Sequence, residues 1–170
     1  MIIKMNDLQL IREKHSTKKI VLLKGSFDLL HTGHIYMMEQ AKKYGDILVV
    51  IVKPNVAIKN KGDDRPIIDE IDRVLQVDSI KYVNYTILAN QDVGEFEYKD
   101  IKELQTKRYC EIVNKLKPNV LVHPKGHKNP NELEKLYEEL NTKIIEIERD
   151  ESKTSTTKII NKIRNYKWYM

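Results

Sequence analysis

Residues 19–45 read KIVLLKGSFDLLHTGHIYMMEQAKKYG and contain the most informative pattern for the fold. Its first part, Lys19–Lys24, is a short aliphatic run that predicts a buried strand. Its last part, His34–Tyr44, carries apolar residues at helical spacing, and Gly45 is well suited to end that helix. A loop bounded by Gly25 and Gly33 joins the two parts. The stretch therefore predicts a strand, a loop and a helix in succession, as in α/β folds.

The same alternation continues towards both ends of the chain. Ile47–Val52 (ILVVIV) is apolar throughout, which is typical of a central parallel strand buried on both faces. Strands alternating with helices imply right-handed crossovers and a doubly wound sheet. We therefore expect a single Rossmann-like α/β domain over residues 1–170, with a parallel five-stranded sheet. The further strands are expected at Lys81–Leu88, Pro118–His123 and Lys143–Ile147. The further helices are expected within residues 1–16, at Asp69–Val77, at Lys99–Leu116, at Asn131–Leu140 and within the C-terminal segment 155–170. We expect the helix at Asp69–Val77 to present Ile71, Val74 and Leu75 on its inner face.

Composition places the chain among globular proteins. A chain of 170 residues can close one hydrophobic core but leaves no room for a second domain with its own core. Hydrophobic residues make up 41%, too many for a disordered chain, and the longest apolar run is far below the roughly 20 residues of a membrane span. The N-terminus lacks the apolar region of a signal peptide, and the lone Cys110 excludes an internal disulfide. We expect a cytoplasmic protein with no membrane partner.

The charge balance favours anionic partners. Lys and Arg number 30 against 25 Asp and Glu, which gives a formal charge of +5. This charge and the aromatic C-terminal end at Tyr166–Tyr169 raise nucleic-acid binding as a hypothesis. The excess is modest and is balanced by many acids, so we expect no nucleic-acid partner. The aromatic end is better suited to packing against the domain or a partner subunit, and a two-fold homodimer is the expected assembly.

The loops that follow the expected strands gather at one edge of the sheet, where open α/β sheets bind ligands. The first loop places His31 and His34 at the start of a helix, whose free N–H groups and positive dipole end favour phosphate. Gly33 lets an anion approach the backbone closely, and the Thr32 hydroxyl is a candidate cap. The alternatives are surface histidines or half of a metal site. No further ligand stands at a recognised metal spacing, so we expect no metal site made by the protein alone.

Three later loops supply further polar groups. Lys59, Lys61 and Arg65 form a basic cluster that is either solvated surface or a phosphate contact. The hydroxyls of residues 155–157 serve equally as helix caps and as an anion-binding helix start. Residues 123–127 (HPKGH) form either another ligand edge or a simple turn.

The segment GSFDLLHTGH at residues 25–34 resembles the signature of the cytidylyltransferase-like nucleotidyltransferases, the HxGH family. The chain further resembles the adenylyltransferase half of the bifunctional heptose-phosphate kinase/adenylyltransferases over residues 20–83, 118–122 and 155–160. Glycerol-3-phosphate cytidylyltransferase shares the first and last motifs, and archaeal-type FAD synthetases are further relatives. The resemblance implies a Rossmann-like fold. It also implies transfer of a nucleoside monophosphate from ATP or CTP to a sugar phosphate or polyol phosphate, of the heptose-1-phosphate or glycerol-3-phosphate type, with release of pyrophosphate.

The resemblance also implies roles for individual residues. His31 and His34 contact the triphosphate, His34 stabilises the transition state, Lys61 contacts the phosphates of the reacting pair, and Mg²⁺ is the expected cofactor. The implied nucleotide-binding residues are Gly25, Ser26, Phe27, His31, Gly33, His34, Arg65, Lys125, Ser155, Thr156 and Thr157, and the implied acceptor-binding residues are Asp28, Lys59, Arg73, His123 and His127.

Two departures from the family pattern bear on the substrate. Ser26 stands where the heptose enzymes often have Cys, which is a mild change. Those enzymes also carry a Lys-Gly-Gly-Asp-Tyr-like stretch after the fourth strand, whereas residues 123–127 contain no acidic residue. The reaction class is therefore better supported than the acceptor. Two alternatives stay open: a catalytically silent nucleotide-binding module of the same fold, and an adenylyltransferase of the FAD-synthetase type.

Overall fold

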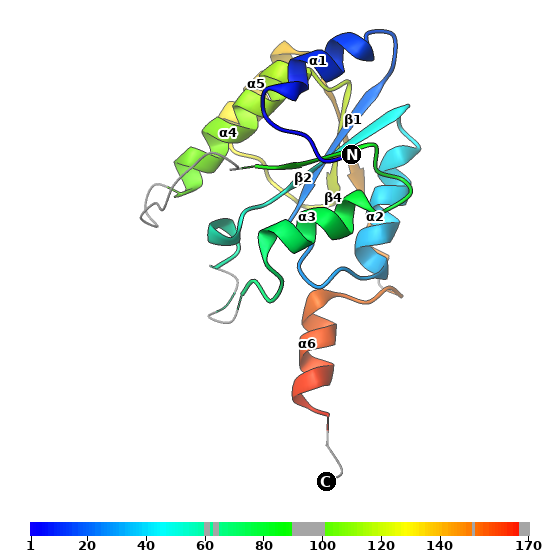
Figure 1. The fold of residues 1–170 in the computed structure, drawn as a ribbon, viewed down its shortest axis with the longest axis vertical. Helices are drawn as coiled ribbons and strands as arrows, with labels where there is room; N and C mark the ends of the chain where they lie inside the picture. Colours follow the sequence, from blue (N-terminus) through cyan, green and yellow to red (C-terminus); the bar gives the residue numbers. More distant parts are fainter. Residues whose placement is uncertain (60–61, 63–64, 90–100, 151, 167–170) are drawn as a thin grey trace.

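The computed structural model describes residues 1–59, 62, 65–89, 101–150 and 152–166 (Figure 1). Within them, one sheet of five parallel strands has the order β3-β2-β1-β4-β5. The strand order reverses direction on either side of β1, as in a doubly wound sheet, so the predicted Rossmann-like α/β fold is confirmed. The strands are β1 (Ile20–Gly25), β2 (Ile47–Val52), β3 (Tyr85–Leu88), β4 (Val120–Pro124) and β5 (Lys143–Ile147).

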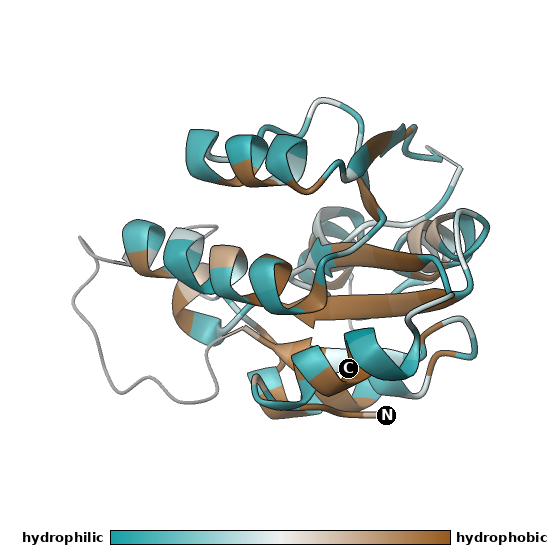
Figure 2. Ribbon diagram, turned by 90° about the horizontal axis from the view of Figure 1, so that it is seen from above, coloured by the Kyte–Doolittle hydropathy of each residue, from teal (hydrophilic) through white to brown (hydrophobic). Residues whose placement is uncertain are grey.

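Helices cover both faces of the sheet. The alternation along β1 sends Ile20 and Leu22 towards one core and Val21 and Leu23 towards the other. Side chains of α1, α4 and α5 close the first core, and those of α2 and α3 close the second, which gives the apolar middle layer seen in Figure 2. The helices are α1 (Asp7–Lys14), α2 (Thr32–Lys42), the short 3-10 helix η1 (Asn55–Ala57), α3 (Glu70–Asp78), α4 (Ile101–Leu116), α5 (Asn131–Glu139) and α6 (Thr156–Arg164).

The strand at the β3 edge differs from the prediction. It begins at Tyr85 rather than at residue 81, because residues 81–84 form a turn and a bend, and the Asn84 side chain rather than a strand carbonyl binds an N–H of β2. Its Oδ1 accepts hydrogen bonds from the Leu48 N–H at 2.9 Å and from Lys42 Nζ at 2.7 Å. Beyond β3, the chain start adds a parallel bridge in which the N–H of Ile3 donates to the carbonyl of Thr86 at 2.9 Å.

The predicted inner face of α3 was partly wrong. Val74 is buried as expected, but Ile71 and Leu75 are 57% and 53% exposed. The inward stripe consists instead of Arg73, Val74 and Val77. The reason is the guanidinium of Arg73, whose hydrogen bonds to the loops after β1 and β2 turn the helix so that its two large aliphatic residues face outwards.

The last helix stands apart from the layers. In Figure 1, α6 projects from the body of the molecule, and it contains no buried side chain. Its N-terminal end nevertheless reaches the carboxyl edge of the sheet, as the site below shows. Among the described residues, no helix is long and apolar enough to cross a membrane.

Candidate active site

A cavity of about 710 Å³ opens at the carboxyl edge of the sheet, where the sequence predicted a ligand site. Its walls come from the end of β1 and the loop after it, the start of α2, the end of β4, and the segment that leads into α6. The lining includes these predicted residues: Gly25, Ser26, Phe27, Asp28, His31, Gly33, His34, Arg65, His123, His127, Ser155, Thr156 and Thr157.

Two stacked imidazoles mark the start of α2. The rings of His31 and His34 have centroids 3.7 Å apart and an angle of 18° between their planes, and Phe27 meets His34 edge-on at 5.3 Å. His31 is the N-cap, since its Nδ1 accepts a hydrogen bond from the His34 N–H at 3.3 Å. The expectation that Thr32 would cap this helix was therefore wrong, because an imidazole nitrogen already occupies that position.

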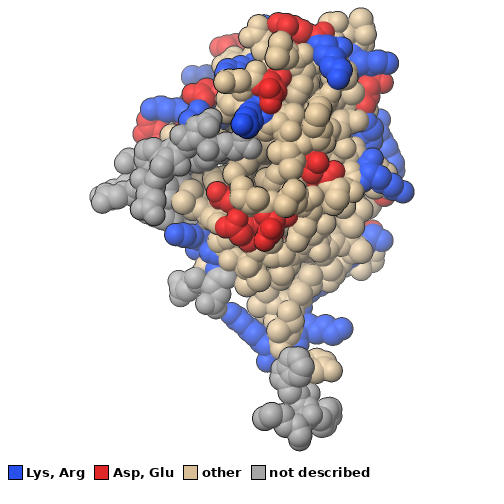
Figure 3. All heavy atoms as spheres, in the orientation of Figure 1, with Lys and Arg blue, Asp and Glu red and all other residues tan. Residues whose placement is uncertain are grey.

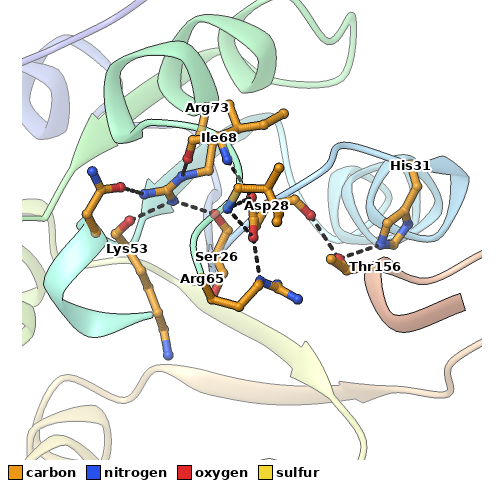
Figure 4. Close-up of polar contacts among 10 residues, drawn as sticks. Ser26, Asp28, His31, Lys53, Arg65, Ile68, Arg73 and Thr156 are labelled. Atoms are coloured by element: carbon orange, nitrogen blue, oxygen red, sulfur yellow. Dashed lines mark hydrogen bonds and ion pairs between the residues drawn. The ribbon is translucent and has the colours of Figure 1, made fainter. Parts of the chain in front are cut away.

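The N-terminus of α6 meets the N-terminus of α2 across the cavity (Figure 4). The Thr156 hydroxyl donates to the Asp28 carbonyl at 2.8 Å and lies 3.4 Å from Nε2 of His31. Since His31 Nδ1 accepts, the neutral ring carries its proton on Nε2 and donates it to that hydroxyl. Burial lowers the pKa of His31, which favours this neutral form.

The close approach of these helix starts explains Gly33. A Cβ at this position would lie 2.7 Å from the carbonyl oxygen of Thr154 and 3.1 Å from the His31 ring. Ser155 then caps α6 by accepting a hydrogen bond from the Lys158 N–H at 3.2 Å. Two helix N-termini therefore point their free N–H groups and positive dipole ends at one cavity, an arrangement suited to a polyphosphate.

The side chains of Asp28 and Arg73 hold the loops of the site by polar contacts (Figure 4). The Asp28 carboxylate forms an ion pair with Arg65 at 2.6 Å and accepts from the N–H groups of Ile67 and Ile68 at 3.0–3.1 Å. Arg73 is fully buried, and its guanidinium donates to four oxygens at 2.6–2.9 Å, three of them backbone carbonyls of residues 26, 53 and 68. Arg73 does not line the cavity, so its expected acceptor contact has no support in this geometry. Asp28 does line the cavity, and its expected acceptor contact stays a prediction.

Two other predicted residues that the structure describes, Lys59 and Lys125, do not line the cavity. Lys59 is exposed outside it, and Lys125 is exposed and paired with Glu148. Their expected ligand contacts therefore have no support in this geometry. Lys61 lies outside the described residues, so its expected phosphate contact stays a prediction.

Several cations that line the cavity were not predicted from the sequence. They lie at the ends of strands or near the start of α6, and a single Lys or Arg at such a position has no local sequence pattern that indicates a binding site. Together with Arg65 they outnumber the lining acids Asp28 and Asp150, so the cavity is strongly positive. The missed cations are Lys24, Lys53, Arg149, Lys153 and Lys158.

Burial and the neighbouring cations together shift the protonation of His127. Its pKa is lowered to about 4, first by burial and then by the charges of Lys24, Lys53, His123 and Arg149. The ring is therefore neutral at pH 7 and can donate or accept a hydrogen bond there. The shift also shows that these groups, which come from the ends of β1, β2, β4 and β5, act on one shared region.

Comparisons with known proteins agree with this geometry. Residues 22–162 match the model of the family described as "Cytidylyltransferase-like". The chain is 35% identical over 150 residues to "Bifunctional protein HldE" of Desulfatibacillum aliphaticivorans, covering 87% of this chain and 27% of that one. A second HldE, of Helicobacter pylori strain 26695, is 31% identical over 95% of this chain and 31% of its own length. The chain thus spans about a third or less of these curated relatives.

Two solved structures are similar in fold. The lipopolysaccharide core biosynthesis protein of Thermoplasma volcanium is 28% identical, with a TM-score of 0.55 over 78% of this chain and 98% of that one. Pantoate-beta-alanine ligase of Francisella tularensis is 19% identical, with a TM-score of 0.62 over 98% and 73%, a likeness of fold alone. The family model spans the sheet, the paired histidines and the start of α6, and it confirms the predicted family. This chain belongs to the cytidylyltransferase-like family.

Proposed function

We propose that the protein transfers a nucleoside monophosphate from ATP or CTP to a sugar phosphate or polyol phosphate and releases pyrophosphate. The observation that carries this proposal is the meeting of two helix N-termini, with the stacked rings of His31 and His34, on one cationic cavity. The lipopolysaccharide core biosynthesis protein, 28% identical, supports a sugar-phosphate acceptor.

The proposed chemistry needs charge neutralisation more than a strong base. A phosphate oxygen of the acceptor, already ionised at pH 7, attacks the α-phosphorus of the nucleotide. The bond from that phosphorus to the bridging oxygen of the β-phosphate breaks, and pyrophosphate leaves with the electron pair. His34 would donate a hydrogen bond to the developing charge, and the start of α6 at Thr156 and Thr157 would hold the β- and γ-phosphates. Aligned donors of this kind stabilise an in-line transition state without rearranging during the reaction.

Mg²⁺ belongs to this proposal as a companion of the nucleotide. The ion prefers phosphate oxygens and water and takes few protein ligands in such sites. Within the described parts of the chain, no group of three or more His, Cys, Asp or Glu forms a cage for it. When bound with the nucleotide, it would supply positive charge that offsets the negative charge of the phosphates.

We further propose that a second copy of the chain covers α6. A helix of nine residues with no buried side chain is marginal in water by itself. Its exposed Ile163 lies among the basic residues Lys162 and Arg164, whereas the exposed Ile71 and Leu75 of α3 lie among acidic residues. Figure 3 shows the acidic group over α3 and the basic side chains along α6 on the same face. These faces are complementary, so that two copies can exchange α6 around a two-fold axis.

The test of the proposed function begins with nucleotide binding. ATP, CTP, GTP and UTP are each added with Mg²⁺ in a thermal-shift assay, in which a ligand at 100 times its Kd stabilises by about 2.7 kcal/mol. Pyrophosphate release is then measured with the stabilising nucleotide and a panel of sugar and polyol phosphates. ATP or CTP should stabilise the protein, and one acceptor should trigger release. Binding without release from any acceptor would instead indicate the catalytically silent module.

A further inference from the structure

A buried lysine stands at the end of β1, on the opposite side of the strand from the paired histidines. Leu23 faces α2, so its neighbour Lys24 points towards α4 and α5. Lys24 is only 9% exposed, yet it lines the cavity. The cavity therefore has two sides: the histidines and α6 on one, and this ammonium on the other.

The direct contacts of Lys24 orient its charge without neutralising it. Nζ donates to Oδ1 of Asn129 at 2.7 Å and lies 5.1 Å from the centre of the Tyr109 ring. Asn129 is fixed in turn, because its Nδ2 donates to Oε1 of Glu134 at 2.8 Å. Among the residues that the structure describes, no carboxylate forms an ion pair with Lys24. The neutral side-chain amide of Asn129 therefore orients the ammonium group of Lys24.

Leaving this charge without an anion is costly for the folded protein. Burial, followed by the charge of Lys53, lowers the pKa of Lys24 to about 8, although Glu134 and the Cys110 thiol act in the opposite direction. The side chain is still mostly cationic at pH 7. A buried cation without a counter-ion opposes folding, and an anion that binds beside it removes that cost. The neutral His127 ring on the same cavity would supply an uncharged hydrogen-bond partner for such an anion.

We propose that Lys24 binds an oxyanion of the acceptor, its carboxylate or its phosphate, in a subsite between β1, α4 and α5. This inference rests on the proposed function, because the triphosphate is assigned to the opposite side of the cavity. The inference adds a requirement on the acceptor that nucleotide binding alone does not set. The acceptor must carry a negatively charged group that reaches Lys24.

The experiment compares the full-length protein with Lys24→Met, which keeps the length of the side chain and removes its charge. Both are first saturated with Mg²⁺ and the non-reacting α,β-methylene analogue of ATP or CTP. Binding of glycerol, glycerol 3-phosphate and 3-phosphoglycerate is then measured by titration calorimetry. Lys115→Met, an exposed site on α4, removes the same charge away from the cavity and serves as the matched control.

Lys24→Met should weaken binding of the anionic probes about 10- to 100-fold, the size of one charge-assisted hydrogen bond, and leave the nucleotide analogue unaffected. An equal loss for both phosphorylated probes would assign Lys24 to the phosphate. A loss confined to 3-phosphoglycerate would assign it to a carboxylate. Glycerol should not bind, and Lys115→Met should match the unmodified protein. Unchanged probe affinity in Lys24→Met, or no probe binding to the unmodified protein, would overturn the inference.

A stability measurement separates this role from a structural one. Without ligands, Lys24→Met should melt at the same temperature as the unmodified protein or a few degrees higher, because an uncompensated buried charge is gone. Asn129→Asp provides a second variant, since its carboxylate would pair with Lys24 and exclude the probes. If Asn129→Asp binds them normally, the subsite is wrong. If the nucleotide analogue itself fails to bind the unmodified protein, the proposed function fails first, and the two failures remain distinguishable.

Discussion

The imidazoles of His31 and His34 act as one group, because ring stacking and a capping hydrogen bond fix each relative to the other. The His31 ring cannot shift without breaking its hydrogen bond to the His34 N–H at the start of α2. Through Thr156 the pair is also tied to α6, so the donors around the proposed triphosphate are set before any ligand arrives. Such preorganisation is what an electrostatic mechanism requires.

Replacing His34 with alanine tests this preorganised donor. His34→Ala should keep the fold but lower the rate of pyrophosphate release about 100- to 1000-fold, because one donor aimed at the developing charge is lost. The rate is measured with the acceptor identified by the panel. His15→Ala, a histidine hydrogen-bonded to Tyr85 away from the cavity, is the control and should retain the rate. A near-normal rate in His34→Ala would remove this residue from the mechanism.

His127 predicts a loss of stability in acid. Its pKa is lowered from 6.5 to about 4, mainly by burial. Below pH 6.5 the unfolded chain takes up a proton at this ring, whereas the folded chain takes it up only near pH 4. The free energy of unfolding therefore falls as the pH drops through this window. His31, whose pKa burial also lowers, acts in the same direction.

Thermal unfolding between pH 7 and pH 4 measures this effect. His127→Gln should lose less stability over the window than the unmodified protein does, since the substituted amide does not titrate. Identical slopes in the two proteins would show that His127 is not shielded as the structure describes.

A buried side chain of α3, that of Arg73, helps to hold the loops of the site. The Arg73 guanidinium joins the helix to the loops after β1 and β2 by hydrogen bonds to buried oxygens. Arg73→Met should lower the free energy of unfolding by about 3–5 kcal/mol, because those oxygens lose their donor. Chemical denaturation checks this value. Arg108→Met, on the surface of α4, should change it by less than about 1 kcal/mol. Equal effects of the two substitutions on the free energy of unfolding would contradict the stabilising role of the Arg73 hydrogen bonds.

Much of the fold could be predicted because its elements carry strong local patterns. The run Ile47–Val52 is too apolar for any position except a central strand, and β2 has those bounds. The start of β3 and the inner face of α3 were harder to predict, because each depends on a distant contact. Asn84 bonds to β2, and Arg73 bonds to two loops, and neither partner is visible in the local pattern.

The residues of the candidate site also fall into those that could be predicted from the sequence and those that could not. The paired histidines and the hydroxyls at the start of α6 could be predicted, since a helix start after a strand is a local feature. Lys24 and Arg149 could not, because a lone cation acquires meaning only when the sheet brings strand ends together. Arg73 shows the converse case, because this predicted acceptor residue donates to backbone carbonyls and does not line the cavity.

For the whole molecule, the uneven surface predicts self-association. The basic, apolar face of α6 should pack on the acidic, apolar face of α3 in a second copy. Sedimentation should show a dimer, and Ile163→Asp should shift it to monomer by placing a charge in the contact. Leu10→Asp alters an equally exposed residue on α1 and should leave the dimer intact. A monomer at all concentrations, or a dimer that Ile163→Asp does not dissociate, would contradict the proposed contact between α6 and α3 of two copies.

We expect nucleotide binding to depend on the position of α6. The helix projects from the body, yet its first turn completes the cavity. A crystal structure with Mg²⁺ and the α,β-methylene analogue of the preferred nucleotide therefore shows whether the two helix starts bind the triphosphate together. We expect the triphosphate to lie between the rings of His31 and His34 and the first turn of α6. Phosphates bound away from that turn, with both imidazoles out of contact, would contradict it.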